Sequence, residues 1–191
     1  VIYRLSNGKT FANEQSLFLG WNVPAVQSMD LNGDGLPDFV PVETGSMRVN
    51  YSNGVFPDLL DTSDNGVGGV ATIEYAPSTN FNNPKLPFPL QLVKSESKSS
   101  NRGDAYTTQY DYAQGLWDGA QREFRGFGLV KVIDPQGSYM ETDFLQDEIF
   151  HGRVVEQRAF DSSQNIFSKT KYTWSSSPIA AGVNFVFLQR K

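Results

Sequence analysis

The chain has 191 residues, a formal net charge of −5 at pH 7 and no cysteine. This length suffices for one large or two small domains, and the absence of thiols excludes disulfides, thiolate metal sites and cysteine nucleophiles. Lys and Arg are scattered singly, so no basic stripe for nucleic acid is present, and the longest apolar stretches, such as Val183–Leu188, are far too short for membrane insertion.

The composition favours strands over helices. Aromatic residues make up 13% of the chain, beside 17 Gly and 10 Pro, which is typical of strands joined by tight turns. Period-two alternation recurs, whereas no segment shows the apolar spacing of an amphipathic helix. We therefore predict an all-β fold of antiparallel hairpins and meander. Because the chain begins at Val1 rather than Met, we interpret it as a fragment of a longer protein.

A loop near the N-terminal end has the pattern of a cation site. Its oxygen-bearing side chains are Asp30, Asn32, Asp34 and Asp38, at the first, third, fifth and ninth positions. Ca²⁺ takes about six to eight oxygen ligands, Gly35 permits a sharp bend, and Leu36 would add its backbone carbonyl. An EF-hand would need Glu where Pro41 stands, and the flanks 25–29 and 39–42 are predicted strands. The sequence predicts a structural calcium site, and the alternative is an Asp/Asn/Gly turn without metal.

Two stretches resemble boundaries between elements. Asp61–Gly69 is polar and rich in Gly, which indicates a linker or loop. Pro77–Pro89 contains four prolines and cannot lie in the middle of a sheet, because proline lacks the ladder donor. We expect it to be an ordered surface crossing. The predicted domains are residues 1–62, with the calcium loop, and residues 63–191.

Turn sequences divide the second half into three predicted hairpins. The turns are Asn101–Asp104, Asp134–Gly137 and Asp161–Asn165. They would join residues 90–98 to 105–112, 128–133 to 138–145, and 154–160 to 166–174, as in an antiparallel meander. The terminal run Val183–Leu188 is apolar and β-prone, so we expect it to pair with another chain or to fold back over its own sheet.

Few residues suit catalysis, so we predict that the chain is not an enzyme. His151 is the single histidine, no Gly-x-Ser-x-Gly elbow is present, and a turn position before Gly152 is the simpler interpretation. Asp147 and Glu148 could serve glycoside hydrolysis, but neighbours on a strand point to opposite faces.

Three further patterns have a structural and a functional interpretation. The charged side chains of Arg122, Glu123 and Arg125 could clamp a substrate, although ion pairs that order the chain around Phe124–Phe127 are favoured, with Gly126 and Gly128 allowing close backbone approach. Arg102-Gly103-Asp104 spells an integrin-binding tripeptide at a predicted hairpin tip. Tyr106, Tyr110 and Tyr112 share a predicted strand face, which is more often packing than a sugar-stacking surface.

Several segments resemble one family of bacterial toxins. Trp21–Met29, the metal loop and Phe39–Val42 are similar to an FG-GAP repeat of integrin-α-like β-propellers. Asn65–Thr79 resembles a segment of the B components of insecticidal Tc toxin complexes, which also occurs in SpvB-like proteins. The match continues with Arg122–Gly128, Phe150–Arg153 and the hairpin that ends at Tyr172–Trp174. The resemblance covers nearly the whole chain.

The resemblance implies a structural and assembly segment of a secreted bacterial toxin. In the family, a β-propeller docks on the channel-forming A component, and the remainder joins Rhs/YD-repeat strands of a C component in a shell around an effector. This chain would supply a propeller edge and a stretch of shell wall. The alternative function is a calcium-dependent extracellular module that recognises glycan or protein.

Overall fold

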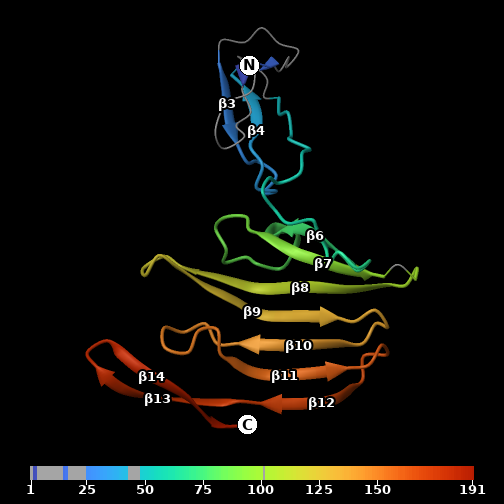
Figure 1. The fold of residues 1–191 in the computed structure, drawn as a ribbon. Helices are drawn as coiled ribbons and strands as arrows, with labels where there is room; N and C mark the ends of the chain where they lie inside the picture. The colour runs from blue at the N-terminus through green and yellow to red at the C-terminus, as the bar shows by residue number, and fades with distance from the viewer. Residues whose placement is uncertain (1, 4–14, 17–24, 43–47, 101) are drawn as a thin grey trace. The chain divides into compact units, whose positions relative to one another are not determined.

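The computed structural model describes residues 2–3, 15–16, 25–42, 48–100 and 102–191, and every strand pair in this part of the chain is antiparallel. The predicted all-β class is therefore confirmed (Figure 1). The chain divides into two compact units, one of Val1–Asn32 with Leu36–Val55 and one of Gly33–Gly35 with Phe56–Lys191. The domain boundary predicted between residues 62 and 63 coincides with the start of a strand and stays a prediction.

The first unit contains two short hairpins. Strand β1 (Ile2–Tyr3) pairs with β2 (Gln15–Ser16), and β3 (Val26–Met29) pairs with β4 (Asp38–Pro41). Strands β3 and β4 flank the predicted metal loop, as expected from the sequence. Trp21–Pro24, part of the FG-GAP-like pattern, lies outside the described residues, and the propeller repeat stays a prediction.

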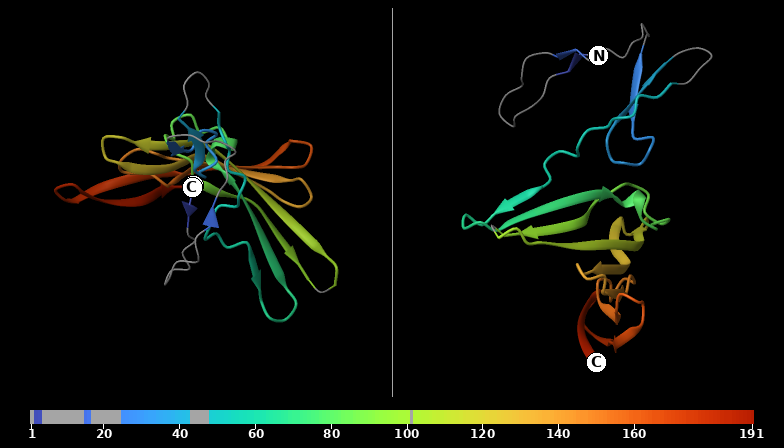
Figure 2. Two further views of the ribbon diagram at one scale, coloured as in Figure 1. Left: turned by 90° about the horizontal axis from the view of Figure 1, so that it is seen from above. Right: turned by 90° about the vertical axis from the view of Figure 1, so that its right-hand side faces the viewer.

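The second unit is built on an eight-stranded meander, ordered β5 to β12 along both the chain and the sheet. Its strands are β5 (Thr62–Asp64), β6 (Val70–Pro77), β7 (Gln91–Ser99), β8 (Ala105–Asp118), β9 (Glu123–Ile133), β10 (Tyr139–Phe144), β11 (Val154–Phe160) and β12 (Ile166–Lys171). The three predicted hairpins are confirmed as β7–β8, β9–β10 and β11–β12. Seen from above, the strands fan out with the twist expected of a sheet (Figure 2).

Two parts of the meander differ from the prediction. Residues 61–69 are not simply a loop, since Thr62–Asp64 forms β5 and pairs with β6 through a tight turn. In that turn the Asn65 side-chain oxygen accepts the N–H groups of Val67 and Gly69, at 3.0 and 2.9 Å. The turn of the β8–β9 hairpin differs from the prediction as well. Gln114 has a φ of 59°, and the register shifts between Gly115 and Trp117, so the period-two pattern is broken before β8 ends.

The proline-rich segment crosses beside the sheet, as predicted. It begins with a single 3₁₀ turn, η1 (Ser78–Asn80), and hydrogen bonds of Asn83 hold it in place. The Asn83 side chain donates to the Ser78 carbonyl at 3.0 Å and accepts from the Gly115 N–H at 2.7 Å. Aromatic side chains fill the space, with Phe81 against Tyr112 at 5.5 Å between ring centroids. The segment therefore covers one face of β8.

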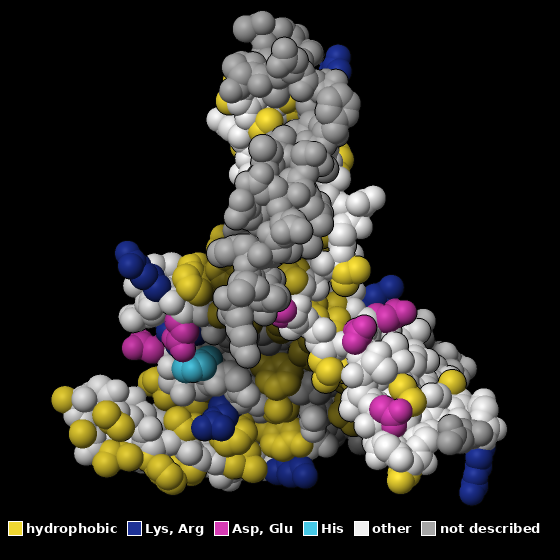
Figure 3. Space-filling view, turned by 45° about the horizontal axis from the view of Figure 1, so that its top comes forward, with side chains coloured by type: hydrophobic (Ala, Val, Ile, Leu, Met, Phe, Trp, Pro, Cys, Tyr) yellow, Lys and Arg dark blue, Asp and Glu magenta, His cyan; other side chains and the backbone are white. Residues whose placement is uncertain are grey.

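The last two strands form a separate hairpin. Strand β13 (Thr173–Ala180) pairs with β14 (Val183–Arg190), with Trp174 opposite Leu188. The run Val183–Leu188 thus pairs edge to edge with its own chain, rather than folding over the face of the sheet. Phe185 remains 57% exposed, and hydrophobic side chains gather over this hairpin at the lower left of Figure 3. The described residues contain no helix with the length and apolar character to cross a membrane.

Candidate functional site

The last residue of the predicted metal loop is the most deeply buried. Asp38 opens β4 and is fully buried, with its two carboxylate oxygens accepting the N–H groups of Leu31 and Ser52, both at 2.9 Å. The N–H of Leu31, followed by that of Ser52, holds the pKa of Asp38 below its ordinary value, against the opposing effect of burial. Asp38 therefore ties the start of the loop to the segment after β4.

The middle of the loop clusters with the second unit. Thr79 donates its hydroxyl to the Gly33 carbonyl at 2.5 Å, and the Gln91 side-chain amide donates to the Asp34 carbonyl at 2.6 Å. Gly33 and Gly35 have φ of 75° and 85°, a region that disfavours other residues. A Cβ atom on Gly33 would also lie 2.9 Å from Thr79 Cγ2. Both glycines are therefore required by this loop.

The predicted ligands differ in burial, and their donor atoms suit a hard cation. Asp30 and Asn32 are exposed, Asp34 and Leu36 are half-buried, and Asp38 is buried. Across the described part of the chain, no three His, Cys, Asp or Glu side chains gather in a metal-holding group. Asp38 already accepts backbone N–H groups, and the calcium site stays a prediction.

A charged cluster lies at the end of the β8–β9 hairpin. The side chain of Arg125 is 4% exposed, and its guanidinium lies 2.9 Å from a Glu123 oxygen and 3.3 Å from an Asp118 oxygen. Asp118 also accepts the N–H groups of Ala120 and Gln121, and the latter bond is the largest cause of its lowered pKa. The predicted ordering ion pairs are confirmed for Glu123 and Arg125, whereas Arg122 is exposed at the turn.

The single histidine completes this cluster from the loop after β10. His151 Nδ1 lies 3.2 Å from Arg125 Nη1 and 3.2 Å from the Glu148 carbonyl oxygen, while Nε2 lies 3.6 Å from a Glu123 oxygen. The predicted turn position before Gly152 is confirmed. The cluster joins the β8–β9 hairpin to the β10–β11 loop. Its ion pairs and hydrogen bonds therefore have a structural role.

The Phe-Arg-Gly-Phe-Gly motif is explained by packing along β9. Phe124 and Phe127 meet at 5.4 Å between ring centroids. Gly128 lies so close to the Gln114 side chain that an added Cβ would stand 2.7 Å from its oxygen, which confirms the predicted close approach. The predicted close approach is wrong for Gly126, because no atom lies within 4 Å of its Cβ position. Glycine suits this position because its φ is 83°.

The other sequence candidates lie apart from one another. Arg102–Asp104 forms an exposed hairpin tip, as predicted. Asp147 belongs to a turn rather than a strand, where it accepts the N–H groups of Ile149 and Phe150. The tyrosine stripe is split, because Tyr112 packs between Phe81 and Phe127 while Tyr106 is 56% exposed.

Sequence reasoning missed an ion-pair network across three strands. Arg158 on β11 lies 3.1 Å from a Glu141 oxygen, 2.8 Å from an Asp143 oxygen and 3.3 Å from a Glu156 oxygen. Lys169 and Lys171 of β12 contact Glu156 at 2.8 and 3.6 Å. Alternate charged residues in each strand were the available signal, but the strand register was needed to bring them together.

These features are those of a structural module rather than of a catalytic centre. An antiparallel meander held by ion pairs, turn-capping carboxylates and aromatic packing is typical of a structural β module.

Comparison with known proteins identifies the family. The family described as "Insecticide toxin TcdB middle/N-terminal region" matches residues 21–157, so this chain belongs to that family. A search of curated proteins finds no match.

Solved toxin structures share the fold. The TcdB2–TccC3 complex without its hypervariable C-terminal region is 17% identical, with a TM-score of 0.78 over 98% of this chain and 13% of that one. The TcdB2–TccC3–TEV complex is 16% identical, with a TM-score of 0.73 over 94% and 13%. The Photorhabdus luminescens Tc holotoxin pore is 17% identical, with a TM-score of 0.75 over 91% and 12%. The chain thus spans about an eighth of the chains that it resembles.

Proposed function

We propose that this chain is a structural segment of the B-type component of a secreted bacterial Tc toxin, and that it forms part of the effector-enclosing shell without catalysing a reaction. The family match over residues 21–157 carries the proposal. The fold likeness to TcdB2–TccC3 over nearly the whole chain supports it. The ion pairs of Arg125 and Arg158 also fit a structural role, because they connect neighbouring elements of the sheet.

The proposed partners follow from the same comparison. TcdB2 is in complex with TccC3 in the similar structures, and a related structure is a holotoxin pore. We propose that the protein containing this chain assembles with a C-type Rhs/effector component and an A-type channel component outside the bacterial cell. Neither nucleic acid nor membrane insertion by this segment belongs to the proposal.

We further propose that the loop of Asp30–Asp38 binds Ca²⁺ and belongs to an FG-GAP propeller repeat. The side chains of Asp30, Asn32, Asp34 and Asp38 and the carbonyl of Leu36 would supply the oxygen ligands. The positive φ of Gly33 and Gly35 supports a tight loop of this kind. The ion would have a structural role, fixing the loop between β3 and β4.

The assembly proposal is tested by two matched substitutions in the β8–β9 hairpin. The full protein containing this chain is co-expressed with its C-type component, and size exclusion reports whether they elute together. Gly128→Ala should weaken the complex, because the new methyl group meets Gln114 and costs about 1–3 kcal/mol. Gly119→Ala should not, since no atom lies within 4 Å of that site.

The parent protein provides the decisive control. If it folds and elutes without the C-type component under every condition, the assembly proposal fails. If both glycine variants assemble as well as the parent, this sheet does not contribute to the complex.

A further inference from the structure

The turn between β7 and β8 is built without the side chains of Arg102 and Asp104. The Ser100 N–H donates to the Asp104 carbonyl at 3.1 Å, and the Gly103 N–H donates to the Ser100 carbonyl at 3.2 Å. The Ser100 hydroxyl accepts the Arg102 N–H at 3.2 Å. Gly103 has a φ of 85°, which glycine adopts readily. The turn therefore explains the glycine, but not the two charged residues beside it.

Other turns of the meander use their carboxylates, and this turn does not. Asp134 and Asp161 each accept two backbone N–H groups of their own turns, at 2.8 to 2.9 Å. Asp118 does the same in the β8–β9 turn, at 3.0 and 3.1 Å. Among the described residues, the Asp104 carboxylate has neither a hydrogen-bond donor nor an ion-pair partner. It is available to an external partner.

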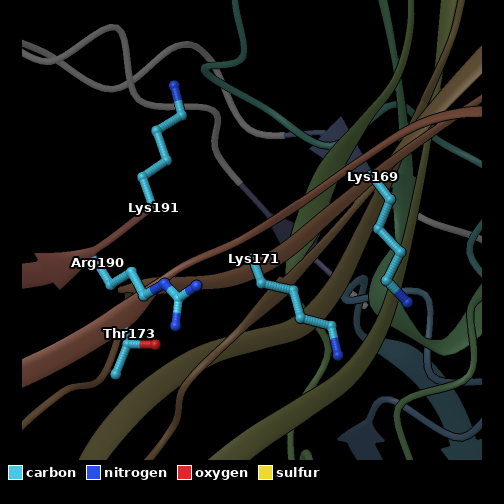
Figure 4. Close-up of a pocket in the computed structure, with 5 residues that line it drawn as sticks. All are labelled: Lys169, Lys171, Thr173, Arg190 and Lys191. Atoms are coloured by element: carbon cyan, nitrogen blue, oxygen red, sulfur yellow. The ribbon is translucent and has the colours of Figure 1, made fainter.

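The guanidinium of Arg102 is available in the same way. Exposed lysines on β12 show the usual arrangement, since Lys169 and Lys171 both contact Glu156, at 2.8 and 3.6 Å. Figure 4 shows these two lysine side chains extending in the same direction. The exposed Arg102 side chain has no carboxylate partner in the described part of the chain. Arg102 and Asp104 thus form no pair with each other or with the sheet.

An exposed aromatic side chain lies close to this turn. Tyr106 is 56% exposed and stands opposite Lys98 of β7 in the strand register. Tyr and Arg are enriched among the residues that carry most of the binding energy in protein interfaces. The turn lies at the outer end of both strands (Figure 1). Arg102, Asp104 and Tyr106 therefore present a guanidinium, a carboxylate and an aromatic ring along one short, exposed stretch.

We propose that the β7–β8 tip is a receptor-binding epitope, recognised by a cell-surface receptor of the integrin type. The order Arg-Gly-Asp suits a receptor that holds a divalent cation near an acidic pocket. Asp104 would give carboxylate oxygens to the cation, because hard cations take oxygen ligands. Arg102 would bind a receptor carboxylate through two parallel hydrogen bonds. The inference goes beyond the shell role, and it rests on the proposal that the protein acts outside the bacterial cell.

The experiment uses the full protein containing this chain in complex with its C-type component. Surface plasmon resonance measures binding to a purified vitronectin-receptor integrin in the presence of Mn²⁺. The complex should bind, and a cyclic Arg-Gly-Asp peptide should displace it, whereas a cyclic Arg-Ala-Asp peptide should not. Size exclusion of the same samples shows whether the C-type component is bound. A failure of receptor binding is therefore distinguished from a failure of the proposed assembly.

Charge-conserving variants locate the epitope. Asp104→Glu should weaken binding about tenfold or more, because the longer side chain displaces the carboxylate from the receptor's cation. Arg102→Lys should also weaken it, since lysine lacks the planar fork, while Arg122→Lys at the exposed β8–β9 turn should leave it unchanged. Circular dichroism checks that the variants fold. No binding, binding that the Arg-Gly-Asp peptide does not displace, or equal binding by Asp104→Glu and the parent would each overturn the epitope.

Discussion

At the scale of single residues, polar groups with defined partners constrain this chain more than large apolar side chains do. Among the described residues, the buried hydrophobic residues are Val40 and Ala76, while Asp38 and Arg125 are buried and charged. Burying a charge is costly unless partners compensate it. Asp38 accepts backbone N–H groups, and Arg125 pairs with Glu123. The register of the sheet is therefore fixed by specific polar contacts as well as by packing.

Arg125 provides the first prediction at this scale. Arg125→Ala should lower the free energy of unfolding by about 1–2 kcal/mol, because it removes a buried side chain together with its ion pairs to Asp118 and Glu123. Arg122→Ala, at the exposed turn of the same hairpin, should change it by less than about 0.5 kcal/mol. Urea unfolding measures both variants. Equal effects would show that the ion pairs of Arg125 do not stabilise the fold.

The carboxylates predict how stability depends on pH. The N–H of Gln121 lowers the pKa of Asp118, and the hydrogen bond from Lys169 lowers the pKa of Glu156. Because the folded state has the lower pKa, each group stabilises the fold above its unfolded pKa of about 4, and this contribution is lost as pH falls through the folded value. The melting temperature should drop below about pH 4, and less steeply in Asp118→Asn.

At the scale of elements, local patterns predicted hairpins wherever turn residues and alternation agreed. Asp134–Gly137 is an example, since the Asp134 side chain accepts two backbone N–H groups of its own turn. The β8–β9 hairpin could not be predicted in this way, because Gln114 and Arg122 both adopt positive φ without being glycine. Such positions depend on tertiary contacts that the sequence pattern does not display.

The calcium loop provides the prediction at the element scale. Chain saturated with Ca²⁺ at about 100 times its Kd should gain roughly 2.7 kcal/mol of stability over chelator-treated chain. Asp34→Ala should abolish the gain, since it removes one predicted ligand, and Asp104→Ala at the exposed hairpin tip should keep it. Differential scanning calorimetry with elemental analysis decides, and identical curves with no bound metal would refute the site.

The candidate sites show where sequence reasoning stops. The Glu123–Arg125 pair could be predicted because its members are two residues apart. His151 joins them from the β10–β11 loop, and Arg158 of β11 pairs with acidic residues of β10, so both depend on how the strands are placed. Asp38 was predicted as a cation ligand, and its hydrogen bonds to Leu31 and Ser52 became visible only in the folded chain.

At the scale of the whole molecule, the second unit is an open antiparallel meander. Eight strands follow one another without crossover, and among the described residues the β13–β14 hairpin exposes apolar side chains such as Phe187. The chain also corresponds to about an eighth of the toxin chains that it resembles.

A chimera tests the central claim most directly. Residues 21–157 of this chain replace the corresponding segment of TcdB2, and size exclusion measures complex formation with TccC3. If this segment is an interchangeable part of the B-type scaffold, the chimera should fold and elute with TccC3 as a complex the size of the parent's. A chimera that is folded by circular dichroism but elutes apart from TccC3 would contradict the account.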